Sequence, residues 1–245
     1  MSLKEKIKTS SLIIGVTIVL VVISFFFSFY SMYNNAMFAK PFIKEFKADI
    51  YALKSKIQPK GQIVFYGDSI TEMYPIDEMF PNATIINRGI GGNTTIEMEE
   101  RLNSNLFELK PTIVRFLGGA NDLVHNRNPK EIAETIEKIL TKIQQELPDT
   151  IIYVESVYPF NPDYKGQYGI NFVNVRQNKD VLELNSYIKE ICSRLNIVYI
   201  NTHDLLIDEN NNLKDELTLD GLHINNNGYK IVSSELEKYL FNSLT

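Results

Sequence analysis

The residues with the clearest chemical potential are a serine and a histidine that stand far apart in the chain. Ser69 lies in the sequence GDSIT, residues 67–71, directly after the short apolar run 63–66. His223 lies in the sequence DGLH, which begins at Asp220. A serine becomes a strong nucleophile when a histidine, oriented by a carboxylate, removes its proton. The pattern therefore predicts Ser69 as nucleophile, His223 as base and Asp220 as the acid that orients it.

Two further glycine-rich, polar segments follow strand-like runs. The sequence NRGIGGNTT, residues 87–95, comes after the run 83–86, and GGAND, residues 118–122, comes after the run 113–117. In an open α/β sheet, ligands bind outside the carboxyl ends of the strands. We therefore expect these segments and the GDSIT segment to meet at one edge of a sheet, where the chemistry takes place.

These four blocks, in this order, resemble those of the SGNH, or GDSL-type, hydrolase family. The resemblance covers about Gly61 to Leu240, and it is strongest to the branch with platelet-activating-factor acetylhydrolase subunits and lysophospholipase-like esterases. It implies ester hydrolysis on a flavodoxin-like α/β fold and leaves the substrate open. The residues that match the family's site, one by one, are Ser69, Gly92, Asn121, Asp220 and His223.

The resemblance also implies an oxyanion hole with three donors. The backbone N–H of Ser69 lies at a strand-to-helix turn, where free amides and the helix dipole favour an anion. Gly92 adds a second N–H that no side chain obstructs, and Asn121 adds a side-chain NH₂. Donors that are fixed in advance stabilise the charge that develops on the carbonyl oxygen.

A long connection, from Pro159 to about Val175, shows no clear periodicity and holds aromatic residues beside glycines. Loops of this length in compact domains are often functional. We interpret it as a lid or a pocket wall, with Phe160 and Tyr164 as candidate pocket residues. The alternative is a surface loop whose aromatic side chains pack down. His125 is a further candidate pocket residue, whereas His203 is expected to be structural.

Composition excludes several other kinds of chemistry. The single cysteine, Cys192, cannot form an intrachain disulfide, and its helical surroundings favour a buried structural thiol. The sequence has no paired cysteines or HExxH motif for a metal ion and no GxxxxGK loop for a phosphate, so we expect neither metal nor cofactor. Residues 1–8 carry a net charge of +2, which leaves −7 on the remainder because the total is −5. An acidic domain argues against nucleic acid as a partner.

The beginning of the chain predicts a membrane anchor. No charged residue occurs from Thr9 through Ala39, and the apolar stretch Leu12–Tyr30 has 19 residues. At about 1.5 Å per helical residue, this stretch nearly spans the hydrocarbon core of a bilayer. Lysines at 4, 6 and 8 favour an inside N-terminus and a catalytic domain outside the membrane, although lysines at 40, 44 and 47 weaken the bias.

A cleaved signal peptide is the competing interpretation of this beginning, and it would give a secreted protein. The apolar run is longer than the 7–15 residues that are usual in a signal peptide, and no Ala-x-Ala-like site follows it closely. We therefore expect an uncleaved, single-pass anchor in the cell membrane.

The rest of the sequence predicts a three-layer α/β/α fold with a five-stranded parallel sheet. Strands are expected near 63–66, 84–87, 113–117, 151–155 and 197–200, and helices near 95–103, 130–146, 176–194 and 228–241. Such alternation gives a parallel sheet with helices on both faces. The predicted organisation is a basic tail at 1–10, a transmembrane helix at 11–33, an amphipathic linker helix at 34–60 and a catalytic domain at 61–245.

These observations together predict a serine esterase that acts on a small ester outside the membrane. The expected substrates are short acyl esters, acetyl above all, of a carbohydrate or a lipid. Three alternatives remain: an O-acyltransferase that passes the acyl group to a glycan, a lysophospholipase or thioesterase, and an inactive membrane-anchored binding module. The intact set of Ser69, Asp220 and His223 argues against the last.

Overall fold

The computed structural model describes residues 3–125, 127–166 and 169–241, without the side chains of residues 3–16, 19, 29–30 and 32–40. The chain divides into two compact units, Met1–Phe46 and Lys47–Thr245. Within the described residues, no helix combines the length and the apolarity needed to cross a membrane. Many side chains of the expected anchor at 11–33 lie outside the described residues.

The first element, α1, is a single helix from Leu3 to Ile57, and Pro41 lies inside it. The sequence predicts a separate linker helix at 34–60 instead. A proline removes one backbone hydrogen bond and often kinks or ends a helix. Residues 31–57 hold no second proline and no glycine, so no other helix-breaking residue accompanies Pro41.

The second unit is built around a five-stranded sheet in the order β2-β1-β3-β4-β5, and every neighbouring pair is parallel. The strands are β1 (Ile63–Gly67), β2 (Ile85–Gly89), β3 (Ile113–Leu117), β4 (Ile151–Glu155) and β5 (Val198–Ile200). In the register, Gly67 pairs with Gly89 on one side and with Leu117 on the other. These residues are the last of their strands, so the three predicted site loops all begin at the carboxyl ends of neighbouring strands.

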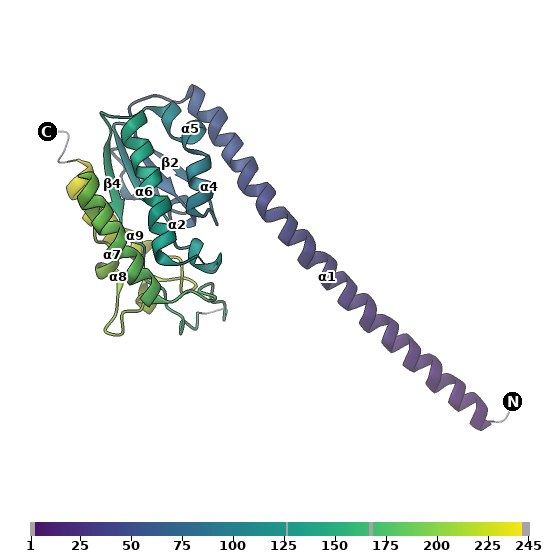
Figure 1. Ribbon diagram of the computed structural model, residues 1–245. Helices are drawn as coiled ribbons and strands as arrows, with labels where there is room; N and C mark the ends of the chain where they lie inside the picture. Colours follow the sequence, from purple (N-terminus) through teal and green to yellow (C-terminus); the bar gives the residue numbers. More distant parts are fainter. Residues whose placement is uncertain (1–2, 126, 167–168, 242–245) are drawn as a thin grey trace. The chain divides into compact units, whose positions relative to one another are not determined.

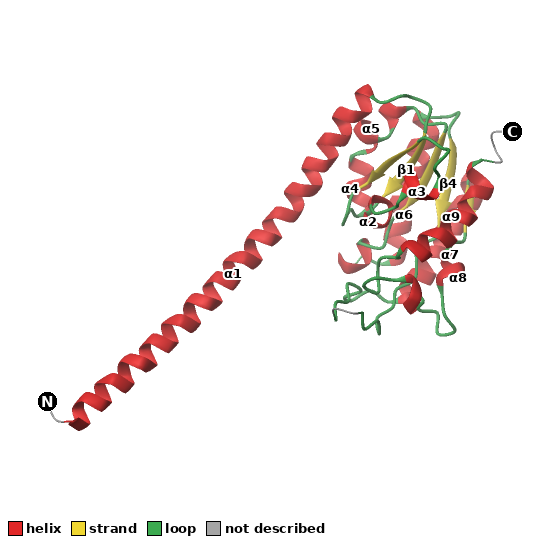
Figure 2. Ribbon diagram, turned by 180° about the vertical axis from the view of Figure 1, so that it is seen from behind, coloured by secondary structure: helices red, strands yellow, loops and turns green. Residues whose placement is uncertain are grey.

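Helices cover both faces of this sheet, as Figures 1 and 2 show. Along β1, Val64 and Tyr66 contribute to one buried apolar cluster, while Ile63 and Phe65 contribute to another. The first cluster includes residues of α4 (Thr95–Glu100), α5 (Leu102–Asn105), α6 (Pro129–Glu146) and α7 (Asn178–Leu195). The second includes residues of α2 (Ser69–Glu72), α3 (Ile76–Met79), α8 (His203–Leu206) and α9 (Asn226–Leu240). The three-layer α/β/α prediction for this domain is confirmed.

Local signals account for several helix ends. Asn128 accepts a hydrogen bond from the Glu131 N–H, and Pro129 occupies the first turn, so α6 begins where the sequence predicts. The C-terminal end of α7 is capped by Asn196, which adopts a left-handed conformation with φ 55°. Cys192 is a free, buried thiol within α7, and burial raises its pKa to about 12. The predicted burial of this thiol is confirmed.

The helix expected at 95–103 is instead divided into α4 and α5, with Arg101 at the junction. The buried guanidinium of Arg101 turns inward and donates to the carbonyl oxygens of Gly67 (2.8 Å) and Arg88 (3.0 Å). These carbonyls lie at the ends of β1 and β2. The described part of the domain also contains three short 3₁₀ helices: η1 (Phe107–Leu109), η2 (Asp122–His125) and η3 (Asp215–Leu217).

Candidate active site

Ser69 is the first residue of α2, directly after the carboxyl end of β1. Asp68 caps this helix, because its Oδ1 accepts the N–H of Ile70 at 3.0 Å. Asp68 is buried, and this burial raises the pKa of its carboxyl from 3.8 to about 6. The cap holds the serine at the sharp turn between strand and helix, with its hydroxyl at the sheet edge.

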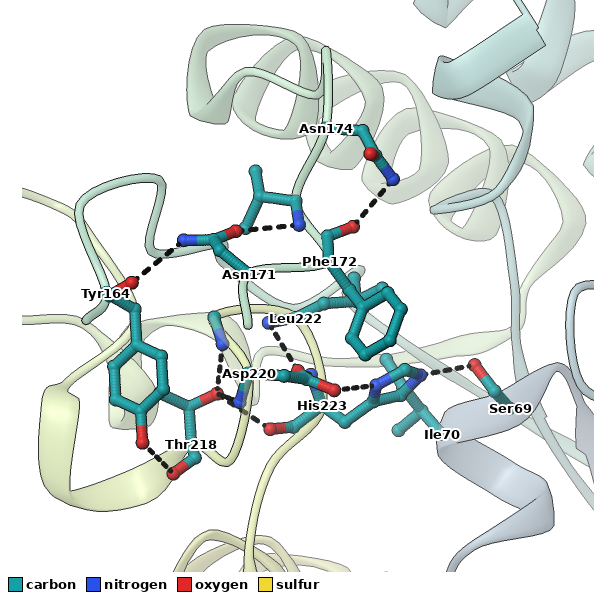
Figure 3. A network of polar contacts seen from close by, with 12 residues as sticks. Ser69, Ile70, Tyr164, Asn171, Phe172, Asn174, Thr218, Asp220, Leu222 and His223 are labelled. Atoms are coloured by element: carbon teal, nitrogen blue, oxygen red, sulfur yellow. Dashed lines mark hydrogen bonds and ion pairs between the residues drawn. The ribbon is translucent and has the colours of Figure 1, made fainter. Parts of the chain in front are cut away.

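His223 and Asp220 come from one turn and meet Ser69, as Figure 3 shows. The Nε2 of His223 is 2.9 Å from Ser69 Oγ, and its Nδ1 is 2.7 Å from Asp220 Oδ2. The second carboxylate oxygen of Asp220 accepts the backbone N–H groups of Leu222 (2.9 Å) and His223 (2.7 Å). Partial burial alone would raise the pKa of Asp220, but the hydrogen bonds from these groups hold it below its usual value. Asp220 is therefore an anion that fixes the imidazole.

The tightness of this turn depends on Gly221. Its φ is +82°, in the left-handed region that favours glycine, and an added Cβ would lie 2.5 Å from the carbonyl oxygen of Asn161. The backbone N–H of Asn161 in turn donates to the Gly221 carbonyl at 2.8 Å. The connection after β4 and the histidine turn therefore support each other.

The loops after β2 and β3 lie next to the serine. An added Cβ at Gly91 would lie 3.8 Å from Ser69 Cβ, so the loop passes directly beside the nucleophile. Asn121 Nδ2 donates to the carbonyl oxygen of Asn93 at 3.1 Å, which joins the two loops. The predicted residues of the three loops are therefore brought to one place.

Three donors of this site remain available for a ligand. Within the described part of the chain, the backbone N–H groups of Ser69 and Gly92 make no hydrogen bond to the protein. Gly92 has a φ of +75°, which again favours glycine. The Asn121 side chain uses one N–H for Asn93 and has a second to offer. Free donors beside a nucleophile are suited to bind an oxyanion.

The glycine loop after β2 is supported by groups that the sequence analysis does not single out. The Glu72 carboxylate accepts the N–H of Gly91 and pairs with Lys47 of α1. Tyr51, also on α1, donates its hydroxyl to the carbonyl oxygen of Gly89 at 3.1 Å. The last turns of α1 therefore belong to the framework of the site.

Two buried arginines also hold the loops that carry Gly92 and Asn121, which we call the oxyanion side of the site. Arg101 donates to Asn93 Oδ1 at 2.7 Å, and Arg176 donates to Asn121 Oδ1 at 2.9 Å. Neither belongs to a motif, and the residues of the site loops that they hold, Asn93 and Asn121, lie 8 and 55 positions away in the chain. No signal in a single sequence marks such pairs.

The candidate pocket residues differ in how exposed they are. Phe160 is 1% exposed and packs in the core, so it is not free to line a pocket. Its backbone N–H is held by Asn178 at 2.8 Å, which fixes the chain in this position. Tyr164 is half-buried and donates its hydroxyl to the Thr218 carbonyl at 3.4 Å, whereas His125 is exposed at the end of η2.

The aromatic residue that does lie beside the base is Phe172. Its ring centroid is 6.4 Å from that of His223, in an edge-on arrangement that Figure 3 shows, and its side chain is 50% exposed. Its N–H donates to the Asp220 carbonyl at 2.9 Å. Other large apolar residues are also exposed, namely Ile170 and Val175 in the same long connection and Leu219 in the turn before His223. The long connection therefore contributes an apolar rim beside His223.

The remaining histidine, His203, is buried and does not belong to the turn that carries His223. Its Nδ1 lies 3.0 Å from Asp204, and its backbone N–H donates to Ser156 Oγ at 2.7 Å. These contacts agree with the structural role expected for it. Among the described residues, no group of three or more His, Cys, Asp or Glu side chains is arranged to hold a metal ion.

Solved structures with the same fold are known. A protein from Streptococcus pneumonia, provisionally described as a platelet activating factor, has 29% sequence identity and a TM-score of 0.79, over 85% of this chain and 97% of that chain. The lipase/acylhydrolase from Enterococcus faecalis has 23% identity and a TM-score of 0.62, over 75% and 97%. The acetyl xylan esterase AlAXEase has 20% identity and a TM-score of 0.60, over 73% and 99%. None of the curated proteins compared with the chain matches it.

The sequence pattern of one protein family covers most of the chain. Residues 65–231, which include Ser69 and His223, match the GDSL-like Lipase/Acylhydrolase family. This range also contains the three loops that meet at the serine. The chain therefore belongs to the GDSL-like lipase/acylhydrolase family and is a carboxylic ester hydrolase.

Proposed function

We propose that the protein hydrolyses carboxylic esters through a triad of Ser69, His223 and Asp220. The observation that carries this proposal is the continuous hydrogen-bonded path from Ser69 Oγ through the imidazole to the Asp220 carboxylate, at 2.9 Å and 2.7 Å. In this mechanism, His223 takes the serine proton as Oγ attacks the ester carbonyl. The imidazolium is stabilised by Asp220 and then gives its proton to the departing alcohol. Water repeats the sequence on the acyl-enzyme and releases the acid.

The oxyanion of each tetrahedral intermediate would be bound by three groups. These are the backbone N–H groups of Ser69 and Gly92 and the free N–H of Asn121. Ser69 lies at the N-terminus of a helix, so its N–H also contributes a favourable partial charge. Losing one such donor typically costs about 10²–10³ in turnover.

We further propose short acyl esters, acetyl above all, as substrates. An acetyl xylan esterase and a protein described as a platelet activating factor are among the proteins that share this fold. A second candidate is a lipid ester with a longer chain, because the apolar rim of Phe172 and Leu219 beside His223 is exposed. The two candidates differ in the chain length at which turnover is greatest.

Two measurements test these proposals. A fluorophosphonate probe should label wild-type protein at Ser69 and should not label the Ser69→Ala variant. A series of p-nitrophenyl esters should then show the greatest kcat/KM at two to four carbons, as rough bounds for a short-acyl site. Absence of labelling would refute the serine mechanism, and a maximum at about eight carbons or more would favour the lipid ester.

We also propose that the protein is anchored in the cell membrane by its N-terminal segment, with the catalytic unit outside. The support is the sequence: an uncharged, mostly apolar stretch of 19 residues from Leu12 to Tyr30, with basic residues before it. Full-length protein should then stay with the membrane fraction after carbonate washing, and protease added to intact cells should degrade the catalytic unit. A mature protein in the medium that starts near residue 40 would instead show a cleaved signal peptide.

A further inference from the structure

Arg176 stands out because its guanidinium binds both sides of the active site. The residue precedes α7 and is 7% exposed. Its Nε donates to the Ala120 carbonyl at 2.8 Å, and one Nη donates to Asn121 Oδ1 at 2.9 Å. The other Nη donates to the carbonyl oxygens of Phe172 (3.0 Å) and Val173 (3.2 Å). The planar fork of an arginine suits this set of acceptors, whereas a lysine could not reproduce it.

The contact with Asn121 determines which way its amide points. A guanidinium has only donors, so the group that faces it must be the amide oxygen and not the NH₂. With Oδ1 held by Arg176, the NH₂ is turned to the opposite side, where one N–H binds Asn93 and the other is free. A flipped amide would bring the NH₂ against the guanidinium and present an oxygen to the reacting carbonyl. Such an oxygen would repel the oxyanion.

The contact with Phe172 extends the same control to the base. The carbonyl of Phe172 accepts from Arg176, while its N–H donates to the Asp220 carbonyl. Its ring packs edge-on against the His223 imidazole. One side chain therefore links the loop that carries Asn121 to the turn that carries the base.

The charge of Arg176 is also unusual for a buried cation. Among the described residues, no carboxylate lies within ion-pair distance of it, and its identified acceptors are all neutral carbonyl or amide oxygens. Asp68 attracts this cation from beyond ion-pair distance, and a buried charge without a directly bonded counter-ion is costly. When the substrate oxyanion forms beyond the Asn121 amide, the cation gains an opposite charge, and hydrogen bonds in such a chain polarise one another. This gain occurs in the transition state and not in the ground state.

We propose that Arg176 is a positioning residue that fixes and polarises the Asn121 amide, so that this arginine holds the third oxyanion donor toward the reacting carbonyl. The inference rests on the proposed esterase function. It predicts an effect on turnover that passes through Asn121, because the guanidinium touches Asn121 and not the reacting atoms.

The test is a double-mutant cycle in full-length protein, with p-nitrophenyl acetate as substrate. The variants are Arg176→Ala, Asn121→Ala and the combination, and the matched control is Arg194→Ala, which removes an exposed arginine paired with Glu137. We expect Arg176→Ala to lower kcat by about 10–100-fold with KM changed less than about 3-fold. In the Asn121→Ala background, the same change should cost less than about 3-fold, because the two residues act as one unit. Added guanidinium ion should partly restore the turnover of Arg176→Ala but not that of the combined variant.

Other outcomes would overturn the inference. Equal losses of kcat in both backgrounds would mean that Arg176 acts independently of Asn121, and a change in KM alone would place it in substrate binding. If Arg176→Ala does not fold, Arg176→Lys takes its place in the cycle, since it keeps the charge and loses the fork. Failure of the esterase proposal is separately visible, because wild-type protein would then neither be labelled by a fluorophosphonate nor turn over the ester.

Discussion

The imidazole and carboxylate of the base come from a single turn, whereas the oxyanion donors come from three separate loops. His223 and Asp220 are three residues apart, and the turn is closed by hydrogen bonds among its own atoms. The donors Ser69, Gly92 and Asn121 follow three different strands. Their loops are held by side chains from elsewhere, including Arg101, Arg176, Glu72 and α1.

This difference shows that the two sides of the site have different weaknesses. The turn that carries His223 and Asp220 depends mainly on hydrogen bonds among its own atoms, with added support from Asn161 and Phe172. It should therefore be less sensitive than the oxyanion donors to a substitution at a distance. The oxyanion side depends on a network of long-range contacts, so it should also fail when a supporting residue is changed at a distance. Four substitutions test this contrast, in order of the expected effect on turnover.

The largest effect is expected at the nucleophile. Ser69→Ala removes the attacking oxygen, so kcat for p-nitrophenyl acetate should fall by about 10⁴-fold or more. The melting temperature should change little, since His223 is the one hydrogen-bond partner of this side chain among the described residues. The control is Ser234→Ala on the exposed side of α9, which should keep full activity. Turnover of Ser69→Ala near that of the wild type would refute the triad.

A smaller loss is expected at the oxyanion side. Asn121→Ala removes one donor, so kcat should fall by about 10²–10³-fold while KM stays nearly constant, because the donor matters most when the oxyanion forms. Steady-state kinetics separate the two constants. The exposed Asn103 serves as the control, as Asn103→Ala. A change in KM alone would make Asn121 a substrate-binding residue and remove it from the comparison.

A supporting residue should give a still smaller but measurable loss. Glu72→Ala frees the Gly91 N–H and the Lys47 ammonium, so the glycine loop beside Ser69 loses its anchor. We expect kcat to fall by about 10-fold. Glu99→Ala, which breaks the surface pair with Lys142, is the matched control and should have no effect on kcat. Equal kinetics for both variants would show that the oxyanion donors do not depend on the contacts of Glu72 with Gly91 and Lys47.

The smallest effect on turnover, and a clear effect on stability, is expected at Asp68. Its folded pKa of about 6 lies above the ordinary 3.8, so folding favours the protonated form. Its contribution to stability is complete below about pH 4 and is lost as the pH rises through about 6. Asp68→Asn keeps the oxygen that caps Ile70 but cannot ionise.

Chemical denaturation at several pH values measures this effect. The stability of Asp68→Asn relative to the wild type should increase by up to about 3 kcal/mol between pH 4 and pH 8, in proportion to the pKa shift. Titration of groups that do not interact with Asp68 cancels in the difference, because they are common to both proteins. A difference that does not vary with pH would show that folding does not change the pKa of Asp68.

The sequence is sufficient to predict the parts of the site that are local. Ser69 follows a strand that is buried at every position, and Asp220 and His223 share one turn, so their roles follow from spacing. The strands and the long helices α6, α7 and α9 are likewise marked by apolar periodicity and caps, such as Asn128 before α6. The positions of these elements agree with the structure to within a few residues.

The parts that the sequence does not reveal depend on contacts between distant segments. Arg176 lies 55 positions from Asn121 in the chain, and Lys47 lies 25 positions from Glu72. Periodicity carries no information on such pairs. The same reason explains the wrong prediction for Phe160: an aromatic residue in a long loop packs inward or outward according to neighbours such as Asn178, whose side chain fixes its backbone.

The contacts of α1 with β2 have a consequence for self-association. β2 is the outermost strand on its side of the sheet, and such strands can pair with a second chain. The hydroxyl of Tyr51 donates to the carbonyl oxygen of Gly89 at the end of β2. The side chain of Arg88, in the same strand, donates to Ser55 and Gln58. The end of α1 and Gln58 just after it thus cover part of this edge strand, and we expect a fragment that begins at residue 61 to associate with itself more readily.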